Sequence, residues 1–409
     1  MISNFLPDRY PKVELKRNYP GVYDCLQERG ILESKNVQVR FVGLVNSRPG
    51  ECVVFMPHGA PHDHAKDSFA FAKELMSAIT KFAQHNSRTG ENNKGEPALT
   101  FSALLAAIAE DYRDNGIFSE RVRIKTVNSG KPDWRSTIRD QIPLVAKNGA
   151  PVFTNINTTR PIPSDNNILG SVQAVVIKEI SSMHSWWLAG SMGNRQDPSD
   201  IEEPRWPREA WPRLLSGLRN NLFAERPLRL VSMLIAYLEY TPSSSAGKLV
   251  CGISDFSTVW EAMLRKVLPN VEEGWNTLLP DPRYIGANGT SESRGRMKMD
   301  IVVRKDDRLT IMDAKYYKAE SAGTAPDWSD IVKQFYYAEA LATVHGVPNP
   351  DKIENCFIFP VTDGEKGKLE RLEMFNRDNK RVMRFSPIQC IYISIKKVIS
   401  AYCKGTTIG

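Results

Sequence analysis

The sequence predicts an α/β protein whose C-terminal part is a mixed central sheet flanked by helices, preceded by an α+β N-terminal region. The chain has 409 residues, too many for one small hydrophobic core. Short apolar runs with strand character alternate with longer runs of helical period. The small, polar run 241–248 (TPSSSAGK) separates two such regions. We therefore expect an α+β domain over 1–160, a largely helical connecting region over 161–245 and the sheet-containing domain over 246–409.

The composition is that of a folded protein, with 41% hydrophobic and 25% charged residues. A formal net charge of +7 favours a polyanionic partner, although weakly at this length. The six cysteines include no CxxC pair, which argues against a zinc ribbon and a disulfide framework. No apolar run is long enough for a membrane span, and the first residues, MISNFLPDRYPK, do not resemble a secretory signal. We expect a cytoplasmic protein without a membrane partner.

The N-terminal region begins with two strand-like runs, at 37–45 (VQVRFVGLV) and 51–56 (ECVVFM). Apolar residues at helical spacing then predict helices over 67–84 and 99–112. The polar run 85–96 between them is expected to be a loop.

A basic stretch follows at 121–125, and the run 130–138 (GKPDWRSTI) leads into another expected helix. This order fits a winged-helix-like unit that presents a helix and a basic edge to DNA. It fits a plain α+β packing domain equally well. The domain over 1–160 is accordingly expected to bind a partner or DNA.

The C-terminal region has a more informative order of elements. We expect a helix, a hairpin of two strands, a second helix and two further strands. These elements are expected at 255–268, 297–304 with 309–317, 329–344, 355–361 and 388–395.

Three charged residues stand within the apolar runs of that hairpin. Asp313 and Lys315 are two apart on one strand, so they share a face, and Asp300 can meet them from the preceding strand. Unpaired charges are costly in such apolar surroundings. The pattern therefore favours a functional cluster, with a structural ion-pair cluster as the alternative.

Two carboxylates and an ammonium suit a hard divalent cation. Mg²⁺, or Mn²⁺ in its place, prefers the oxygen ligands that Asp300, Asp313 and the carbonyl of Ala314 can supply. Such an ion lowers the pKa of water and neutralises charge on a phosphate. Lys315 can orient or help deprotonate the attacking water and can stabilise the developing negative charge. Glu261 on the preceding amphipathic helix is a further candidate carboxylate.

Four segments of this region resemble the LlaJI-type restriction endonucleases and the related McrC subunits, which belong to the PD-(D/E)xK nuclease superfamily. They are FSTVWEAML (256–264), MDIV (299–302), IMDAKYY (311–317) and DIVKQFYY (330–337). The resemblance implies a PD-(D/E)xK core with Asp300, Asp313 and Lys315 as catalytic residues. It assigns Glu261 and Gln334 as the catalytic residues of the two helices, with Glu261 also among the metal ligands.

The same resemblance implies a magnesium-dependent endonuclease of a restriction or anti-phage defence system, acting on double-stranded DNA. Such enzymes work with a McrB-like AAA+ GTPase or ATPase, and this sequence has no P-loop of its own. Cutting both strands suggests a homodimer. The alternatives are a stand-alone repair or transposition nuclease and a non-catalytic DNA-binding scaffold.

Two features leave alternatives open. Met299 stands where the family name leads one to expect proline, while a Pro-Asp pair occurs upstream at Pro280-Asp281. Asp281 is therefore a rival to Asp300 as first metal ligand. The histidines of PHGAPHDH, His58, His62 and His64, have a spacing possible for zinc, but the segment is more simply a loop leading into a helix.

Overall fold

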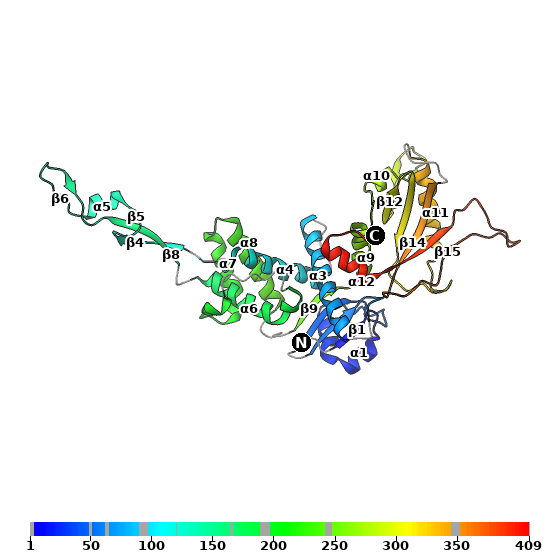
Figure 1. Ribbon diagram of the computed structural model, residues 1–409, viewed down its shortest axis with the longest axis horizontal. Helices are drawn as coiled ribbons and strands as arrows, with labels where there is room; N and C mark the ends of the chain where they lie inside the picture. Colours follow the sequence, from blue (N-terminus) through cyan, green and yellow to red (C-terminus); the bar gives the residue numbers. More distant parts are fainter. Residues whose placement is uncertain are drawn as a thin grey trace. The chain divides into compact units, whose positions relative to one another are not determined.

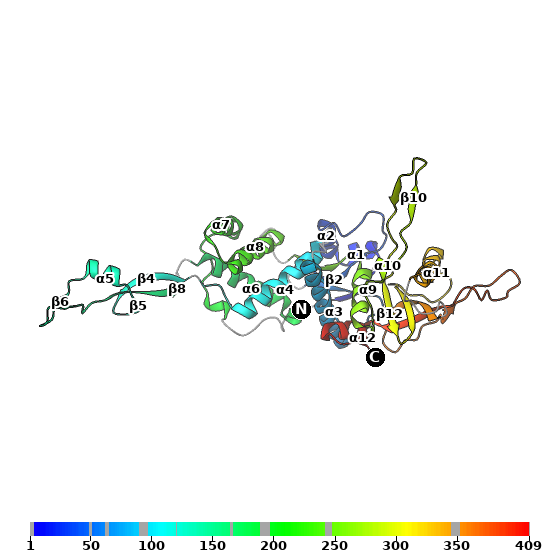
Figure 2. The same ribbon diagram turned by 90° about the horizontal axis from the view of Figure 1, so that it is seen from above.

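The computed structural model describes residues 4–48, 51–61, 65–89, 97–119, 121–163, 167–188, 197–241, 248–344 and 352–408. The chain forms two compact units, of which the first combines residues 1–104 with residues 244–409. The second unit comprises residues 105–243. Figure 1 and Figure 2 show the elements of each unit in two views. No helix among the described residues is long and apolar enough to cross a membrane.

The first unit contains a four-stranded sheet in the order β1-β3-β2-β9. Its strands are β1 (Asn4–Pro7), β2 (Val42–Arg48), β3 (Glu51–Met56) and β9 (Leu249–Ile253). β1 runs parallel to β3, and the other two pairings are antiparallel. The prediction for β3 is confirmed, whereas the preceding strand starts at Val42 instead of residue 37. β9 lies far from the other three strands in sequence, so this sheet combines an N-terminal segment with a segment from the second half of the chain.

Four helices alternate with the strands of this sheet in sequence, two between β1 and β2 and two after β3. They are α1 (Lys12–Asn18), α2 (Pro20–Glu28), α3 (Ala65–Thr89) and α4 (Pro97–Asn115). The expected helices at 67–84 and 99–112 are confirmed. The expected loop is wrong over residues 85–89, which continue α3. Polarity misled the prediction there, because the solvent-facing side of a helix is as polar as a loop.

A five-stranded mixed sheet forms the other part of the first unit, in the order β12-β13-β14-β16-β15. Its strands are β12 (Ile301–Lys305), β13 (Arg308–Ala314), β14 (Ile353–Val361), β15 (Arg371–Leu372) and β16 (Ile388–Ser394). β12 and β13 form the expected antiparallel hairpin, and β13, β14 and β16 run parallel. The hairpin turns at Asp306 and Asp307, and Asp306 adopts a φ of 55°. Aspartate tolerates this left-handed conformation better than most residues.

The helices α9 (Phe256–Val267), α11 (Trp328–Ala342) and α12 (Ile395–Lys404) accompany this sheet. Figure 1 shows α11 running along β14. Tyr337, Ala340 and Leu341 of α11 share a buried cluster with Leu309 and Ile311 of β13. The expected helices at 255–268 and 329–344 are confirmed to within a residue or two at each end. The short helix α10 (Trp275–Leu278) and the hairpin of β10 (Arg283–Ile285) and β11 (Ser291–Ser293) lie between α9 and β12 in sequence.

The second unit has a helical part built around α6 (Ile168–Leu188), α7 (Trp211–Leu218) and α8 (Glu225–Tyr240). A buried ion pair ties these helices to the end of α4. Arg226 of α8 donates two hydrogen bonds to Asp111, at 3.1 and 3.0 Å, and a third to the carbonyl of Gly116. The short 3₁₀ helices η2 (Pro198–Asp200), η3 (Arg208–Ala210) and η4 (Arg219–Asn221) complete this part.

The rest of the second unit, residues 121–163, is a narrow extension that we call the arm (Figure 2). It contains β4 (Arg121–Val127), β5 (Lys131–Pro132), α5 (Trp134–Asp140), β6 (Leu144–Val145), β7 (Pro151–Val152) and β8 (Asn157–Pro163). In the described part of this region a strand follows α4, and α5 is seven residues long. The helix expected from residue 130 onward is present as α5.

Candidate active site

The β12–β13 hairpin brings Asp300 beside Asp313. The last ladder pair is Ile301 with Met312, so one further step of the antiparallel register places Asp300 opposite Asp313. The backbone N–H of Ala314 donates a hydrogen bond of 2.9 Å to Oδ2 of Asp300. The sequence alone did not determine the register of the hairpin. The observed register places the carboxylates of Asp300 and Asp313 side by side.

Lys315 directly follows β13 and completes this group. Its Nζ lies 2.9 Å from Oδ2 of Asp313 and 2.8 Å from Oδ1 of Asp330. The side chains of Lys315 and Asp313 are only 15% and 13% exposed, so the pair is held away from bulk water. Asp330 stands in the first turn of α11 and was not singled out from the sequence. An acidic residue there is expected for its interaction with the helix dipole alone, and the sequence carries no signal that it reaches Lys315.

The proximity of the carboxylates affects their protonation. Burial raises the pKa of Asp313 to about 7; Lys315 opposes this shift and Asp300 adds to it. Burial and the neighbouring Glu261 likewise raise the pKa of Asp300. Burial lowers the pKa of Lys315, but Asp313 and Asp330 outweigh it and the pKa is raised. Lys315 is thus a stable ammonium, while the two aspartates need a cation to remain ionised together.

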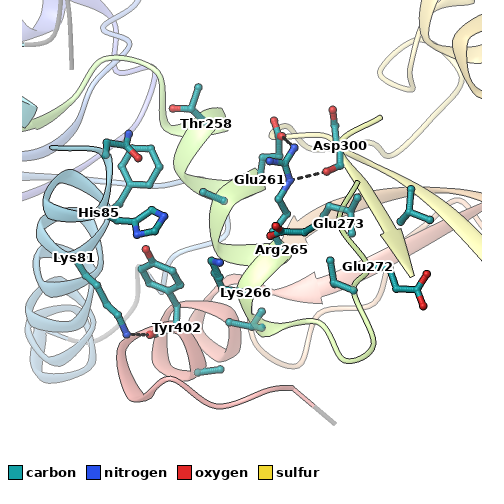
Figure 3. Close-up of a pocket in the computed structure, with 18 of the residues that line it drawn as sticks. Lys81, His85, Thr258, Glu261, Arg265, Lys266, Glu272, Glu273, Asp300 and Tyr402 are labelled. Atoms are coloured by element: carbon teal, nitrogen blue, oxygen red, sulfur yellow. Dashed lines mark hydrogen bonds and ion pairs between the residues drawn. The ribbon is translucent and has the colours of Figure 1, made fainter. Parts of the chain in front are cut away.

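Glu261 approaches this group from α9 but is engaged by Arg265. Nη2 of Arg265 lies 2.5 Å from Oε1 of Glu261, and its Nε donates 2.7 Å to the backbone carbonyl of Asp300 (Figure 3). Among the described residues, no three histidine, cysteine or acidic side chains are grouped closely enough to hold a metal ion. In this arrangement the candidate oxygen ligands are therefore the Asp300 and Asp313 carboxylates and the Ala314 carbonyl.

Gln334 of α11 is 1% exposed. Its carbonyl oxygen Oε1 is buried without a hydrogen-bond partner in the described structure. One turn further along the helix, Tyr337 donates 2.6 Å to the carbonyl of Lys298 and so ties α11 to the segment that leads into Asp300. A buried acceptor without a partner is costly, which is a mark of sites that expect a ligand or water.

A cleft of about 940 Å³ borders this group on the side of α9. Asp300, Glu261 and Arg265 line it together with residues of α3 and α12 (Figure 3). The cleft therefore reaches Asp300 and Glu261, whereas Asp313 and Lys315 are not among its lining residues.

The two remaining sequence candidates lie apart from these contacts. Asp281 accepts hydrogen bonds from Arg283 (3.1 Å) and Ser293 (2.6 Å), both within the β10–β11 hairpin. The backbone N–H of His58 donates 2.9 Å to the hydroxyl of Tyr316. The other histidines of that segment, His62 and His64, lie outside the described residues.

Comparison with known proteins decides the family. A model of the LlaJI restriction endonuclease family matches residues 41–396, well over half of the chain. The chain belongs to the LlaJI restriction endonuclease family. A search of curated proteins finds no significant match. The resemblance to the LlaJI-type restriction endonucleases is thereby confirmed. The matched segment includes the five-stranded sheet and all strands of the four-stranded sheet except β1. Membership in this family makes the chain a restriction nuclease that acts on DNA.

Asparagine substitutions distinguish the two candidate metal aspartates. We expect Asp300→Asn to lower the rate of DNA cleavage by about 10²-fold or more, because it removes one of the two carboxylates of the candidate site. Asp281→Asn should stay within about twofold of wild type, since the hydrogen bonds that Asp281 accepts from described side chains come from its own hairpin. Cleavage rates of the two variants under identical conditions check this. Loss of cutting in Asp281→Asn, with Asp300→Asn active, would reverse the assignment.

Proposed function

We propose that this chain is the DNA-cutting subunit of a restriction or anti-phage defence complex and hydrolyses phosphodiester bonds with Mg²⁺. The observation that carries the proposal is the meeting of Asp300, Asp313 and Lys315 on one hairpin inside the segment that matches the nuclease family. The sheet that holds them, with helices beside it, is proposed to be the PD-(D/E)xK core.

The donor set suits a hard cation. Asp300, Asp313 and the carbonyl of Ala314 offer oxygen atoms only. Burial raises the pKa of both aspartates, and each also has a neighbouring carboxylate that raises its pKa further. These residues would hold Mg²⁺, with Mn²⁺ as a substitute and with Glu261 as a further ligand once released from Arg265. When bound, the ion supplies positive charge against the scissile phosphate and makes water more acidic.

Lys315 then has a defined part in the reaction. Because Asp313 and Asp330 raise its pKa, it keeps its proton and acts as a hydrogen-bond donor rather than as a base. It orients the water that attacks in line with the leaving oxygen, and it stabilises negative charge on the phosphate. Asp330 positions Lys315 from α11, and Gln334 offers its buried amide on the same helix.

The pH dependence of metal binding follows from the raised pKa of Asp313. Below a pH of about 7 the ion must displace a proton, so affinity falls by about tenfold for each pH unit per proton displaced. We expect Mn²⁺ to bind about tenfold tighter at pH 8 than at pH 6, as measured by electron paramagnetic resonance. Asp313→Asn should remove most of this dependence. Equal Mn²⁺ affinity of the wild type at both pH values would contradict the raised pKa of Asp313.

We further propose that a McrB-like AAA+ GTPase or ATPase drives the complex, that region 1–160 binds this partner or DNA, and that two copies of the chain cut the two strands. The test is DNA cleavage by the purified chain with Mg²⁺, alone and with the motor and its nucleotide. Cutting only in the complete mixture is the expected result. Robust cutting by the chain alone would favour a stand-alone repair or transposition nuclease, and no cutting in any mixture a non-catalytic scaffold.

A further inference from the structure

The positive charge of the chain is concentrated in the arm. Residues 121–163 contain eight lysines and arginines against two aspartates, which leaves a formal charge of +6, whereas the whole chain has +7. Such a concentration within 43 residues is not expected of a surface that serves only to keep a protein dissolved.

Both acidic residues of the arm form hydrogen bonds or ion pairs with residues of α5. Asp133 caps α5 by accepting a hydrogen bond of 3.1 Å from the N–H of Ser136. Asp140 forms a bidentate ion pair with Arg139, at 2.6 and 2.9 Å. The other basic side chains described in the arm are exposed and form no ion pair with a described residue; they are Lys125, Lys131, Arg135, Lys147 and Arg160.

Four of these cations lie on the three-stranded sheet of the arm or at the adjoining start of α5. We call Lys125, Lys131 and Arg135 the basic ribbon. Arg160 follows Thr159 on β8 and therefore lies on the other face of the sheet. Lys125 of β4 and Lys131 of β5 both pair with Thr159 of the intervening strand β8. Paired residues share a face, so the two lysines stand in one row, about 10 Å apart across two strand spacings.

We propose that the basic ribbon binds the phosphate backbone of double-stranded DNA independently of sequence. This inference rests on the proposed function, which makes DNA the substrate. Duplex DNA has one negative charge for about every 1.7 Å of its axis. A row of exposed cations can therefore contact phosphates at any position along the duplex. A strand ribbon is one of the forms that lie in a DNA groove. Trp134, 53% exposed next to Arg135, is available for contact with the same backbone.

An acidic protein is the competing occupant. The arm also exposes apolar side chains, notably Ile142, Leu144 and Val145, at 92%, 61% and 76%. They lie past α5 in sequence, in and beside β6, and belong to a different sheet from the ribbon lysines. The basic ribbon is distinguished by its positive charge and not by these apolar side chains. This favours a polyanion over a protein surface as its ligand.

The experiment compares DNA binding by full-length Lys125→Ala/Lys131→Ala with that by the matched control Lys366→Ala/Lys380→Ala. The control changes net charge equally, at exposed lysines of the first unit that lie outside region 1–160. Binding to duplexes of two unrelated sequences is measured by fluorescence anisotropy in EDTA, so no cutting intervenes. The ribbon variant should weaken binding to both duplexes. It should also reduce the slope of log affinity against log salt by about 2, one for each phosphate that a lysine no longer neutralises. The control should keep the wild-type slope.

Each other outcome overturns the proposal. An unchanged affinity and slope in the ribbon variant would place DNA elsewhere. Unchanged DNA binding with loss of co-migration with the motor on gel filtration would assign the ribbon to a protein partner. An equal loss of DNA binding in the control variant would mean that net charge, and not the position of the ribbon lysines, determines binding. Because binding is measured without metal, these results are independent of whether the hairpin cuts DNA.

Discussion

Replacing Lys315 by methionine will lower the rate of DNA cleavage by about 10²- to 10³-fold, the range found when one hydrogen-bond donor to developing negative charge is removed. Methionine keeps the length and apolar stem of lysine but loses the ammonium that lies 2.9 Å from Asp313. DNA binding should persist, because binding energy comes from many phosphate contacts. Single-turnover cleavage with Mg²⁺ and the motor partner measures the effect.

Lys333→Met is the matched control for this variant. Lys333 also approaches Asp330, at 3.5 Å, but its side chain is 44% exposed and its pairing lies along one helix. Its loss should leave cleavage within about twofold of wild type, since exposed pairs contribute little. Wild-type cleavage by Lys315→Met, or equal losses in the two variants, would remove Lys315 from the reaction. Circular dichroism of both variants establishes that the fold is retained.

Replacing Arg226 by alanine will destabilise the second unit by about 3–5 kcal/mol, because it leaves the buried charge of Asp111 without its partner. The Asp111 side chain is 1% exposed and receives two hydrogen bonds from Arg226. Arg226 also binds the carbonyl of Gly116 and so fixes the segment that leads into the arm. Urea unfolding followed by fluorescence gives the free energy of unfolding.

The neighbouring Arg229 provides the control. It lies 3.8 Å from Asp111 and is 60% exposed, so Arg229→Ala should cost less than about 1 kcal/mol. A loss below about 1 kcal/mol in Arg226→Ala would mean that water or Arg229 satisfies Asp111. Replacing both members, in Asp111→Leu/Arg226→Met, should recover part of the stability, since no charge then remains buried.

The hairpin and its charged residues were within reach of the sequence because their signals are local. Strand period places Asp313 and Lys315 on one face, and helical period identifies α9 and α11 around Glu261 and Gln334. The four polar residues 305–308 between two apolar strands predict the pairing that brings in Asp300. Each of these inferences needs only neighbours along the chain.

The residues that contact Lys315 and Asp300 from other elements are brought there by tertiary packing. No local pattern in the sequence indicates these contacts. Asp330 reaches Lys315 only because α11 packs along the sheet, and Arg265 reaches the carbonyl of Asp300 across 35 residues of sequence. The same limit applies to the fold. β9 pairs with β2 although about 200 residues separate them, and an apolar strand does not specify its distant partner.

The most direct test of the account is to locate the metal. Crystals of the chain grown or soaked with Mn²⁺ give an anomalous difference map at the manganese edge. We predict a peak bound by the carboxylates of Asp300 and Asp313 and by the carbonyl of Ala314, with Lys315 beside it. A peak at Asp281 or at the His58 segment, with none at the hairpin, would contradict the proposed nuclease centre.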